Sequence, residues 1–450
     1  MMRRYFGTDG IRGLANRHPM TPEMGMRLGQ VLAWYFGKDH PEPRILIGKD
    51  PRRSSYIFEF AVAAGACSMG ASTYQVGPLP TPAIAFLTQS MRAQAGVMIS
   101  ASHNPFEDNG IKVFGSDGYK LPDDTEAHLE DLLDRGFPEE DRPVGQDLGR
   151  AYRISDAQGR YIVFAQEAFP QDLSLRGLRI VIDCANGAGY RVGPSILEEL
   201  GAQVIERGVW PDGTNINRRC GALHPEFMAE AVVQEGASLG IALDGDGDRL
   251  ILSDEKGRIV DGDAVMALIG TQMLAEGRLA KNTVVATIMS NLGLDRCIQQ
   301  AGGAVVRTRV GDRYVLERMR ADGFSFGGEQ SGHMIFLDHA TTGDGLVSAL
   351  QVLATMVRSG RPLSELADRM ERFPQVHRKL RVSRKPPLEE LPTVRRAVEA
   401  AEREMGESGR TVVRYSGTEN VLRVMVECPS EELACVLADR IVDAATEALN

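Results

Sequence analysis

The chain has 450 residues, of which 43% are hydrophobic and 25% are charged, and its formal net charge is -10. This length is sufficient for about three or four domains, each with a core of its own. The negative charge argues against a nucleic acid or an anionic membrane as a partner, because a chain without a general basic field can hold an anion only through locally placed Arg and Lys side chains.

The cysteines and the first residues bear on the cellular compartment. Six cysteines are scattered along the chain without a C-x-x-C pair or a histidine at metal-ligand spacing, which is typical of a reducing cytosol. Basic residues open the sequence, but no apolar segment follows them, and no stretch approaches the roughly 18 apolar residues of a membrane span. We therefore expect a cytoplasmic protein that is neither exported nor inserted into a membrane.

The first third of the chain alternates strand and helix signals in the manner of βαβ units. Thr21 and Pro22 are typical of an N-cap and a first helical residue, and apolar residues recur after them at helical spacing. The other elements predicted here are strands at 45–47, 72–76 and 96–99 and a helix at 54–69. Together they predict a parallel-rich sheet with helices on its faces, in a first domain of residues 1–152 that ends in a polar segment.

A turn that carries hydroxyl groups follows the last of these strands. Residues 100–105 read Ser-Ala-Ser-His-Asn-Pro, and Pro105 keeps Asn104 away from helical backbone angles. A strand that delivers a hydroxyl into such a turn can present a nucleophile, so we expect Ser102 to be exposed at a sheet edge. The alternative is a structural turn without chemistry, since turns favour Ser, Asn and Pro in any case.

Two basic segments of this domain are predicted to be loops. Arg12 lies in the segment Phe-Gly-Thr-Asp-Gly-Ile-Arg-Gly at 6–13, and Lys112 ends the segment Asn-Gly-Ile-Lys at 109–112. Beside a phosphorylated serine, these two cations would neutralise charge or donate protons. Either residue could instead be a solvated surface charge, as most Arg and Lys side chains are.

A second alternation of strands and helices predicts a domain of residues 153–256. Within it, Asp244, Asp246 and Asp248 alternate with glycines between two apolar strand signals. Alternation lets several carboxylates face one point, and a divalent cation offsets the repulsion between them, so a hard-metal site is predicted. A solvated acidic loop is the alternative. A calcium EF-hand is disfavoured, because Arg249 stands at its sixth position instead of glycine and strands flank the loop.

A third α/β alternation predicts a domain of residues 257–372, with a strand at 283–288 and a long helix at 343–358. Its segment Gly-Gly-Glu-Gln-Ser-Gly-His follows a strand signal. Glu329 and Ser331 would alternate onto one face of an extended loop and hydrogen-bond to neighbouring sugar hydroxyls. His333 would transfer protons or bind phosphate, although a lone histidine is more often structural.

The pattern changes after Val376 to a smaller α+β domain, predicted to span residues 373–450. A segment between two of its strand signals combines arginines, hydroxyls and a glycine, which are the groups that a phosphate dianion requires. A hairpin turn without a ligand is the alternative. The candidate phosphate-binding residues are Arg414, Ser416, Gly417, Thr418 and Arg423.

With these segments identified, the chain resembles the α-D-phosphohexomutase superfamily over its whole length, and within it the branch that acts on glucosamine phosphates. The resemblance implies an α/β fold with three similar α/β domains on mixed sheets and a smaller C-terminal α+β domain, arranged around a central cleft. It implies a phosphorylated Ser102 that shares one Mg²⁺ per chain with Asp244, Asp246 and Asp248. The substrate-binding residues that it implies are Arg249, Glu329, Ser331, Arg414, Ser416, Gly417, Thr418 and Arg423.

The implied activity is the interconversion of glucosamine 6-phosphate and glucosamine 1-phosphate through a bisphosphorylated sugar, which would supply the UDP-N-acetylglucosamine pathway. Lys112 and His333 would move protons and Arg12 would hold the transferring phosphate. A bisphosphorylated sugar or autophosphorylation would activate the enzyme, which would be a monomer or a homodimer. Its fourth domain would close over the cleft about a hinge near residues 373–378. The alternatives are a phosphomannomutase or phosphoglucomutase, a metal-dependent phosphatase, and a regulator that binds phosphosugars without turnover.

Overall fold

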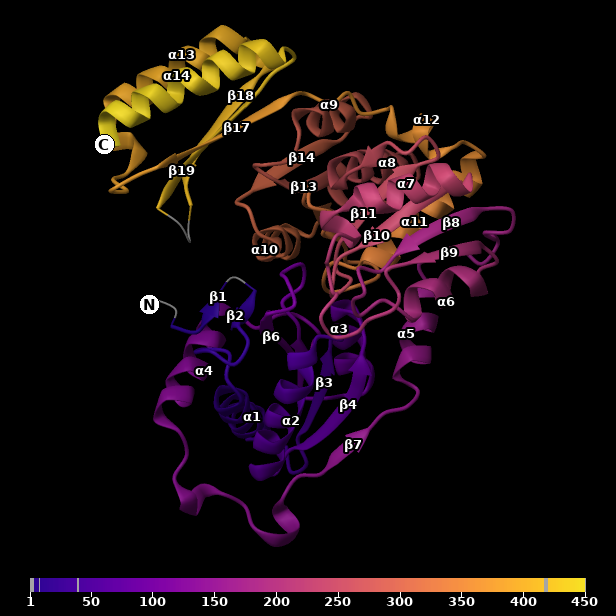
Figure 1. Cartoon of the computed structure of the whole chain (residues 1–450), viewed down its shortest axis with the longest axis vertical. Helices are drawn as coiled ribbons and strands as arrows, with labels where there is room; N and C mark the ends of the chain where they lie inside the picture. The colour runs from indigo at the N-terminus through magenta and orange to yellow at the C-terminus, as the bar shows by residue number, and fades with distance from the viewer. Residues whose placement is uncertain (1–3, 8, 39, 417–419, 450) are drawn as a thin grey trace.

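The structure is a computed structural model, and it describes residues 4–7, 9–38, 40–416 and 420–449. Within these residues, no helix combines the length and the apolar character needed to cross a membrane. Four sheets follow one another along the chain (Figure 1). Three belong to α/β units and the fourth to a smaller α+β unit, so the predicted fold class is confirmed.

The first unit contains a seven-stranded mixed sheet in the order β1-β2-β6-β5-β3-β4-β7. Its strands are β1 (Phe6–Gly7), β2 (Gly10–Leu14), β3 (Arg44–Lys49), β4 (Ser72–Pro78), β5 (Ala95–Ile99), β6 (Asp108–Gly115) and β7 (Ala151–Arg153). Its helices are α1 (Pro22–Gly37), α2 (Arg53–Ser68), α3 (Thr81–Ser90) and α4 (Asp123–Arg135). Strands β5, β3, β4 and β7 are parallel, and the strands on the other side of β5 are antiparallel.

Both basic segments that were predicted to be loops are strands, so that prediction is wrong. Residues 6–7 and 10–14 form the β1–β2 hairpin, and residues 109–112 lie inside β6. The reason is burial, since Ile11 and Ile111 are register partners in the core and draw both segments into the sheet. The helix cap was predicted correctly, because the Thr21 hydroxyl accepts a hydrogen bond from the Met24 amide at the start of α1.

The second and third units contain smaller mixed sheets, in the orders β12-β11-β10-β8-β9 and β14-β13-β15-β16. The second unit comprises α5 (Ala157–Gln166), β8 (Arg179–Asp183), α6 (Val192–Glu199), β9 (Gln203–Arg207), α7 (Pro225–Glu235), β10 (Leu239–Leu243), β11 (Leu250–Asp254) and β12 (Ile259–Val260). The third comprises α8 (Gly262–Ala275), β13 (Thr283–Thr287), α9 (Leu292–Gln300), β14 (Ala304–Thr308), α10 (Asp312–Asp322), β15 (Phe326–Gly328), β16 (Met334–Phe336), α11 (Gly345–Ser359) and α12 (Leu363–Ala367).

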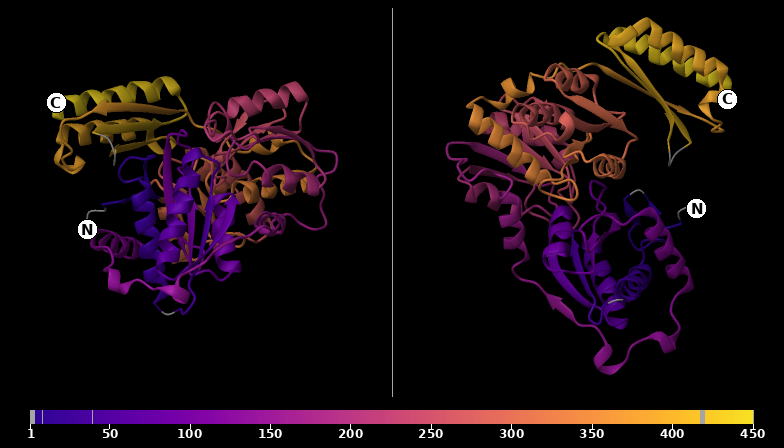
Figure 2. Two further views of the ribbon diagram at one scale, coloured as in Figure 1. Left: turned by 60° about the horizontal axis from the view of Figure 1, so that its bottom comes forward. Right: turned by 180° about the vertical axis from the view of Figure 1, so that it is seen from behind.

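The fourth unit is a three-stranded antiparallel sheet in the order β17-β19-β18, with two helices on one face. Its elements are β17 (Gln375–Arg381), α13 (Pro392–Met405), β18 (Arg410–Tyr415), β19 (Val421–Glu427) and α14 (Glu431–Leu449). The helices lie on the outer side of the sheet in Figures 1 and 2, which leaves the other face toward the rest of the molecule.

The cores show which units are joined into one body. One hydrophobic cluster runs from Leu46 in the first unit through Ile182 in the second to Phe326 in the third. The fourth unit has a separate cluster of its own between its sheet and its two helices. The first three units therefore share a continuous core, whereas the fourth is attached through polar contacts at its edge.

Candidate active site

Ser102 lies just beyond the carboxyl end of β5, in the turn predicted from its sequence. Its amide donates a hydrogen bond to the Ser100 hydroxyl at 2.9 Å, and its backbone is in the left-handed region with φ of 53°. Its hydroxyl donates to Asp244 Oδ2 at 2.6 Å. The prediction of an exposed Ser102 is wrong, because the aspartate loop of the second unit covers the turn and leaves the serine 1% exposed.

The three aspartates occupy the loop between the antiparallel strands β10 and β11, and their side chains converge. One carboxylate oxygen from each lies within 4.8 Å of the other two, and all three residues are buried. Burial and repulsion from Asp248 and Asp246 raise the pKa of Asp244 well above its usual range. Burial opposes ionisation of Asp248 too, but Lys112 and His333 hold its pKa well below the usual range.

The residues of this loop fit a hard cation. Among the described residues, Oδ1 of Asp246 is buried without a hydrogen-bond partner, which is costly for a carboxylate oxygen unless a cation binds it. Lys112 supplies part of that charge, since its ammonium lies 2.8 Å from Asp246 Oδ2 and 3.2 Å from Asp248 Oδ2. Burial alone would lower the pKa of Lys112, but Asp246, Asp9 and Asp248 hold it well above the usual range.

A closed ring of ionisable side chains, here called the charge ring, connects this loop to the other units: carboxylates and lysines alternate along it, and His333 closes it. Beyond Asp248, Lys112 lies 3.1 Å from Asp9, Asp9 also pairs with Lys120, and Lys120 pairs with Asp312. Asp312 lies 3.6 Å from His333 Nε2, and His333 Nδ1 lies 3.6 Å from Asp248. The ring therefore takes members from the first three units and fixes them against one another at the site.

His333 has a defined orientation within the ring. The Gly343 amide donates to its Nε2 at 3.2 Å, which makes Nε2 an acceptor and directs Nδ1 with its proton toward Asp248. Burial would lower the pKa of His333, but Asp248 and Asp312 raise it above the ordinary value. Arg12 is near the ring as well, since its guanidinium pairs with Asp9.

Glu329 and Ser331 lie in a tight turn between β15 and β16, and not in an extended loop as predicted. The Gly332 amide donates to the Glu329 carbonyl at 3.0 Å, and Gly332 takes a φ of 91°. A side chain at Gly332 would meet the Leu250 carbonyl at 2.1 Å, so antiparallel pairing and close contact with β11 fold the segment back. Glu329 Oε1 accepts from the Gly311 amide at 3.0 Å and is half-buried, whereas Ser331 is exposed.

Arg249 follows the aspartate loop and begins the return toward β11. Its amide donates to Asp244 Oδ1 at 3.2 Å, and its Nε lies 3.9 Å from Asp248 Oδ1. The neighbouring His103 faces the Ser102 hydroxyl at 3.3 Å, and burial together with Arg249 and Arg12 lowers its pKa to about 4. Arg249 is therefore a cation beside the serine, while His103 stays neutral at physiological pH.

Two of the candidate phosphate-binding residues, Arg414 and Arg423, belong to the open face of the fourth sheet. Arg414 in β18 is the register partner of Arg423 in β19, and Arg423 is the partner of Lys379 in β17, so three cations form one row across the sheet. Like charges directly opposite one another destabilise a sheet, which favours an anion as the ligand of this row. Burial and Arg423 lower the pKa of Arg414. Ser416 is buried beyond this row, and Gly417 and Thr418 lie outside the described residues.

The fourth unit rests on the third through a polar joint at the far end of the same strands. Arg410 donates to the Ile288 carbonyl at 2.8 Å and pairs with Glu427 at 2.6 Å. Glu427 in turn accepts from the Leu292 amide at 2.6 Å. Two cations of the row, Arg414 and Arg423, therefore lie on the same pair of strands as the joint, β18 and β19, with the joint at the other end of the pair.

Four site residues could not be found from the sequence, namely Asp9, Lys120, Asp312 and Lys379. Asp9 lies within the segment 6–13, but that segment was identified because it contains Arg12. The other three are charged residues whose local sequence carries no motif, and only their partners in other elements reveal them.

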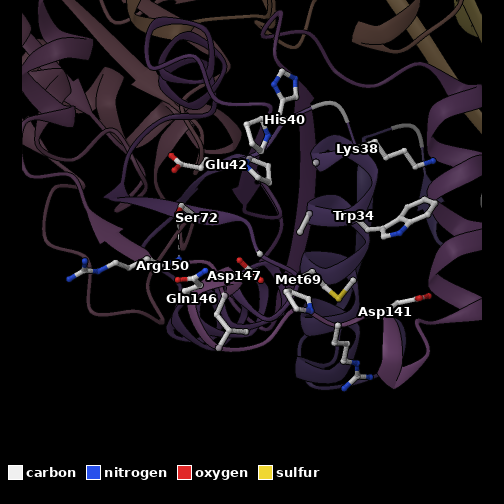
Figure 3. A pocket seen from close by; sticks show the side chains of 18 of the residues that line it. Trp34, Lys38, His40, Glu42, Met69, Ser72, Asp141, Gln146, Asp147 and Arg150 are labelled. Atoms are coloured by element: carbon white, nitrogen blue, oxygen red, sulfur yellow. Dashed lines mark hydrogen bonds between the residues drawn. The ribbon is translucent and has the colours of Figure 1, made fainter.

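A cavity of about 870 Å³ is remote from these residues. Figure 3 shows its lining, which includes Trp34, Lys38, Met69 and Arg150. It lies at the amino ends of β3 and β4, whereas Ser102 follows the carboxyl end of β5, which is parallel to both. A smaller cavity of about 240 Å³, lined by Lys120, Asp312 and His333 among others, adjoins the charge ring.

Four family models match the chain in succession. They are phosphoglucomutase/phosphomannomutase alpha/beta/alpha domain I at residues 3–139, domain II at 160–257, domain III at 261–373 and the C-terminal domain at 378–444. The phosphoglucosamine mutase of Syntrophotalea carbinolica is 56% identical over 444 residues, which are 98% of this chain and 97% of that protein. That of Myxococcus xanthus is 53% identical over 448 residues, 100% of this chain and 98% of that protein.

Solved structures share the fold. A phosphoglucomutase/phosphomannomutase family protein from Burkholderia thailandensis superposes with a TM-score of 0.82 at 21% identity, over 98% of each chain. The N-acetylphosphoglucosamine mutase of Aspergillus fumigatus, solved with GlcNAc-6P and magnesium, gives a TM-score of 0.69 at 19% identity, over 100% of this chain and 96% of that one. At these identities, the likeness concerns the arrangement of the four units.

Proposed function

The chain belongs to the phosphoglucomutase/phosphomannomutase family, and on this premise we propose that it is a phosphoglucosamine mutase, which interconverts glucosamine 6-phosphate and glucosamine 1-phosphate. The observation that carries the proposal is the Ser102 hydroxyl at 2.6 Å from Asp244, within a cluster of three buried aspartates. Identities of 53% and 56% to phosphoglucosamine mutases over nearly the whole chain favour glucosamine as the sugar.

Asp244, Asp246 and Asp248 would hold one Mg²⁺ together with a phosphate on Ser102. The buried Oδ1 of Asp246, which accepts no hydrogen bond among the described residues, and the convergence of three carboxylates support this assignment. Bound there, the ion would neutralise charge on the phosphoryl group during transfer.

In the working enzyme, Ser102 carries a phosphoryl group and gives it to O1 of glucosamine 6-phosphate. A new bond forms between O1 and phosphorus, and the bond between phosphorus and Ser102 Oγ breaks. The bisphosphorylated sugar then reorients end over end without leaving the site. Its 6-phosphoryl group is transferred to Ser102, and glucosamine 1-phosphate is released. A bisphosphorylated sugar or autophosphorylation would phosphorylate Ser102 before the first catalytic cycle.

The charge ring assigns separate tasks to its members. Lys112 has a raised pKa and stays protonated, so it neutralises the transferring group or donates a proton and does not act as a base. His333, held between Asp248 and the Gly343 amide, exchanges protons with the sugar hydroxyls. Arg12 and Arg249 both act electrostatically on His103, the residue after Ser102, and these two cations would hold the transferring phosphate.

The non-reacting phosphate would bind the cationic row of the fourth unit, Lys379, Arg423 and Arg414, together with Ser416, Gly417 and Thr418. Charge recognition without a fixed sugar orientation suits an intermediate that binds in two directions. Glu329 and Ser331 would contact hydroxyls common to both directions. Movement about a hinge near residues 373–378 would bring the row over the serine and keep water out.

The test compares kcat/KM for glucosamine 6-phosphate, glucose 6-phosphate and mannose 6-phosphate, with the wild type and Ser102→Ala measured side by side. We expect the wild type to prefer glucosamine 6-phosphate by at least tenfold. Equal or greater efficiency with glucose or mannose phosphate would identify a sister mutase. Inorganic phosphate as the main product would identify a phosphatase, and tight binding without turnover would identify a regulator.

A cytoplasmic location is part of the proposal, in keeping with six free cysteines.

A further inference from the structure

Arg52 is a fully buried arginine whose side chain ends beneath the serine loop. It is the N-cap residue of α2 and comes three residues after the end of β3. Its exposed fraction is 0%. An arginine is costly to bury unless all its donors are satisfied, so its partners indicate what the burial achieves.

The guanidinium of Arg52 donates to four carbonyl groups of the segment 102–108. Nη2 donates to the carbonyls of Ser102 and Asn104, both at 2.9 Å, and Nη1 donates to those of Pro105 and Asp108. Nε donates to Asp50 Oδ2 at 2.7 Å. One planar guanidinium therefore binds four carbonyl groups of the turn that carries Ser102.

Asp50 connects the guanidinium to the other side of the same turn. Its Oδ2 also accepts from the Ser100 hydroxyl at 2.6 Å, and the Ser100 oxygen accepts from the Ser102 amide at 2.9 Å. Its Oδ1 accepts from the Ser55 hydroxyl at 2.7 Å. Both the amide and the carbonyl of Ser102 are therefore fixed by one connected array.

The second unit adds a donor to the same carbonyls. Asn217 Nδ2 lies 2.9 Å from the Ser102 carbonyl and 3.0 Å from the Asn104 carbonyl. Ser102 has a φ of 53°, a left-handed conformation that a residue with a side chain disfavours. A conformation of this kind persists only where its surroundings over-determine it, and Arg52, Asp50 and Asn217 supply that restraint.

We infer that Arg52 is a positioning residue for phosphoryl transfer: it holds the Ser102 turn in the left-handed conformation that directs Oγ at Asp244, and so sets kcat without contributing to substrate affinity. The inference rests on the proposed mutase function. Among the described residues, the side chain of Arg52 donates hydrogen bonds only to Asp50 and to carbonyls of the segment 102–108. Its loss would therefore change the direction of the Ser102 hydroxyl and leave the sugar and phosphate contacts in place. Misplacement of a reacting group by about 1 Å can reduce a rate by 10²-fold.

The experiment measures kcat and KM of Arg52→Lys together with hydrogen exchange of the peptide that covers residues 100–108. Lysine keeps the charge but replaces a planar fork with one ammonium group, which cannot reach four carbonyls and Asp50 at once. We expect kcat to fall about 10²-fold, KM to stay within twofold, and the amides of Ser102, Asn104 and Asp108 to exchange faster.

Two further variants separate positioning from folding. Val62→Ala removes buried volume from α2 without a contact to the turn, so it is expected to lower the melting temperature and keep kcat. Asn217→Gly removes the donor from the second unit and tolerates the left-handed backbone of residue 217, which has a φ of 57°. It serves as the test if Arg52→Lys does not fold, and we expect it to reduce kcat about tenfold at unchanged KM.

Each other outcome overturns the inference. An unchanged kcat in Arg52→Lys, or an equal loss of kcat in Val62→Ala, would show that Arg52 is merely structural, and a raised KM at unchanged kcat would show that it contributes to substrate binding instead. If the wild type itself converts none of the three hexose phosphates, the mutase proposal fails, and hydrogen exchange then tests the role of Arg52 separately. Unchanged exchange of the 100–108 peptide in Arg52→Lys would show that Arg52 does not restrain the turn.

Discussion

Asp263 provides a quantitative test of the electrostatics beneath the joint of the fourth unit. It is the second residue of α8, it is fully buried, and its Oδ2 accepts from the Asn291 amide at 2.8 Å. The Asn291 side chain in turn exchanges hydrogen bonds with the backbone of Phe373, where the chain leaves the third unit. Burial, with a contribution from Asp261, raises the pKa of Asp263 from 3.8 to about 7.

A raised folded-state pKa means that the folded protein binds more protons than the unfolded chain between pH 3.8 and about 7. Stability is therefore highest when Asp263 is protonated and falls as pH rises through that window. The slope is about 1.4 kcal/mol per pH unit. From pH 5 to pH 7, the ionisation of this one group costs roughly 3 kcal/mol.

Asp263→Asn removes the titration and keeps an oxygen for the Asn291 amide. Scanning calorimetry at pH 5 and pH 8 should show that the wild type loses stability relative to the variant by roughly 3 kcal/mol. Glu317→Gln, which alters an exposed acid of the same unit, is the control and should follow the wild type at both pH values. Parallel pH profiles for the wild type and Asp263→Asn would refute the buried-acid argument.

Three other substitutions test the site itself. Ser102→Ala should abolish turnover with circular dichroism unchanged, and any retained mutase activity would reject the nucleophile. In the wild type, Mg²⁺ at about 100 times its Kd should raise stability by roughly 3 kcal/mol, whereas Asp246→Asn should lose most of this gain and slow turnover; an unchanged Mg²⁺ shift would reject the metal role. Arg414→Ala should raise KM by about 10-fold to 100-fold, from a charge-assisted contact of roughly 1.5 to 3 kcal/mol. Arg378→Ala is its control, since Arg378 pairs with Asp439 on the helix side of the same sheet, and an equal rise in KM there would contradict the cationic row.

Local sequence predicted the elements well, because their signals are short in range. Thr21 and Pro22 predicted the start of α1, and the apolar runs around Asp244 predicted the two strands that hold the aspartate loop. The error at residues 109–112 has the opposite cause. Asn109, Gly110 and Lys112 have weak strand propensity, and the segment becomes β6 because Ile111 pairs with Ile11 across the sheet.

The chemical groups available to this protein can be read from local patterns, because a hydroxyl in a Pro-ended turn, three alternating aspartates and an Arg/Ser/Gly/Thr segment each have a local physical meaning. Which of these groups meet depends on the packing of the units. Ser102 and Asp244 are 142 positions apart, and Lys120 and Asp312 are 192 apart, so their contacts depend on how whole units pack. The same packing buries Ser102, which the turn alone would have exposed, because the aspartate loop closes over it and the guanidinium of Arg52 fills the space beneath.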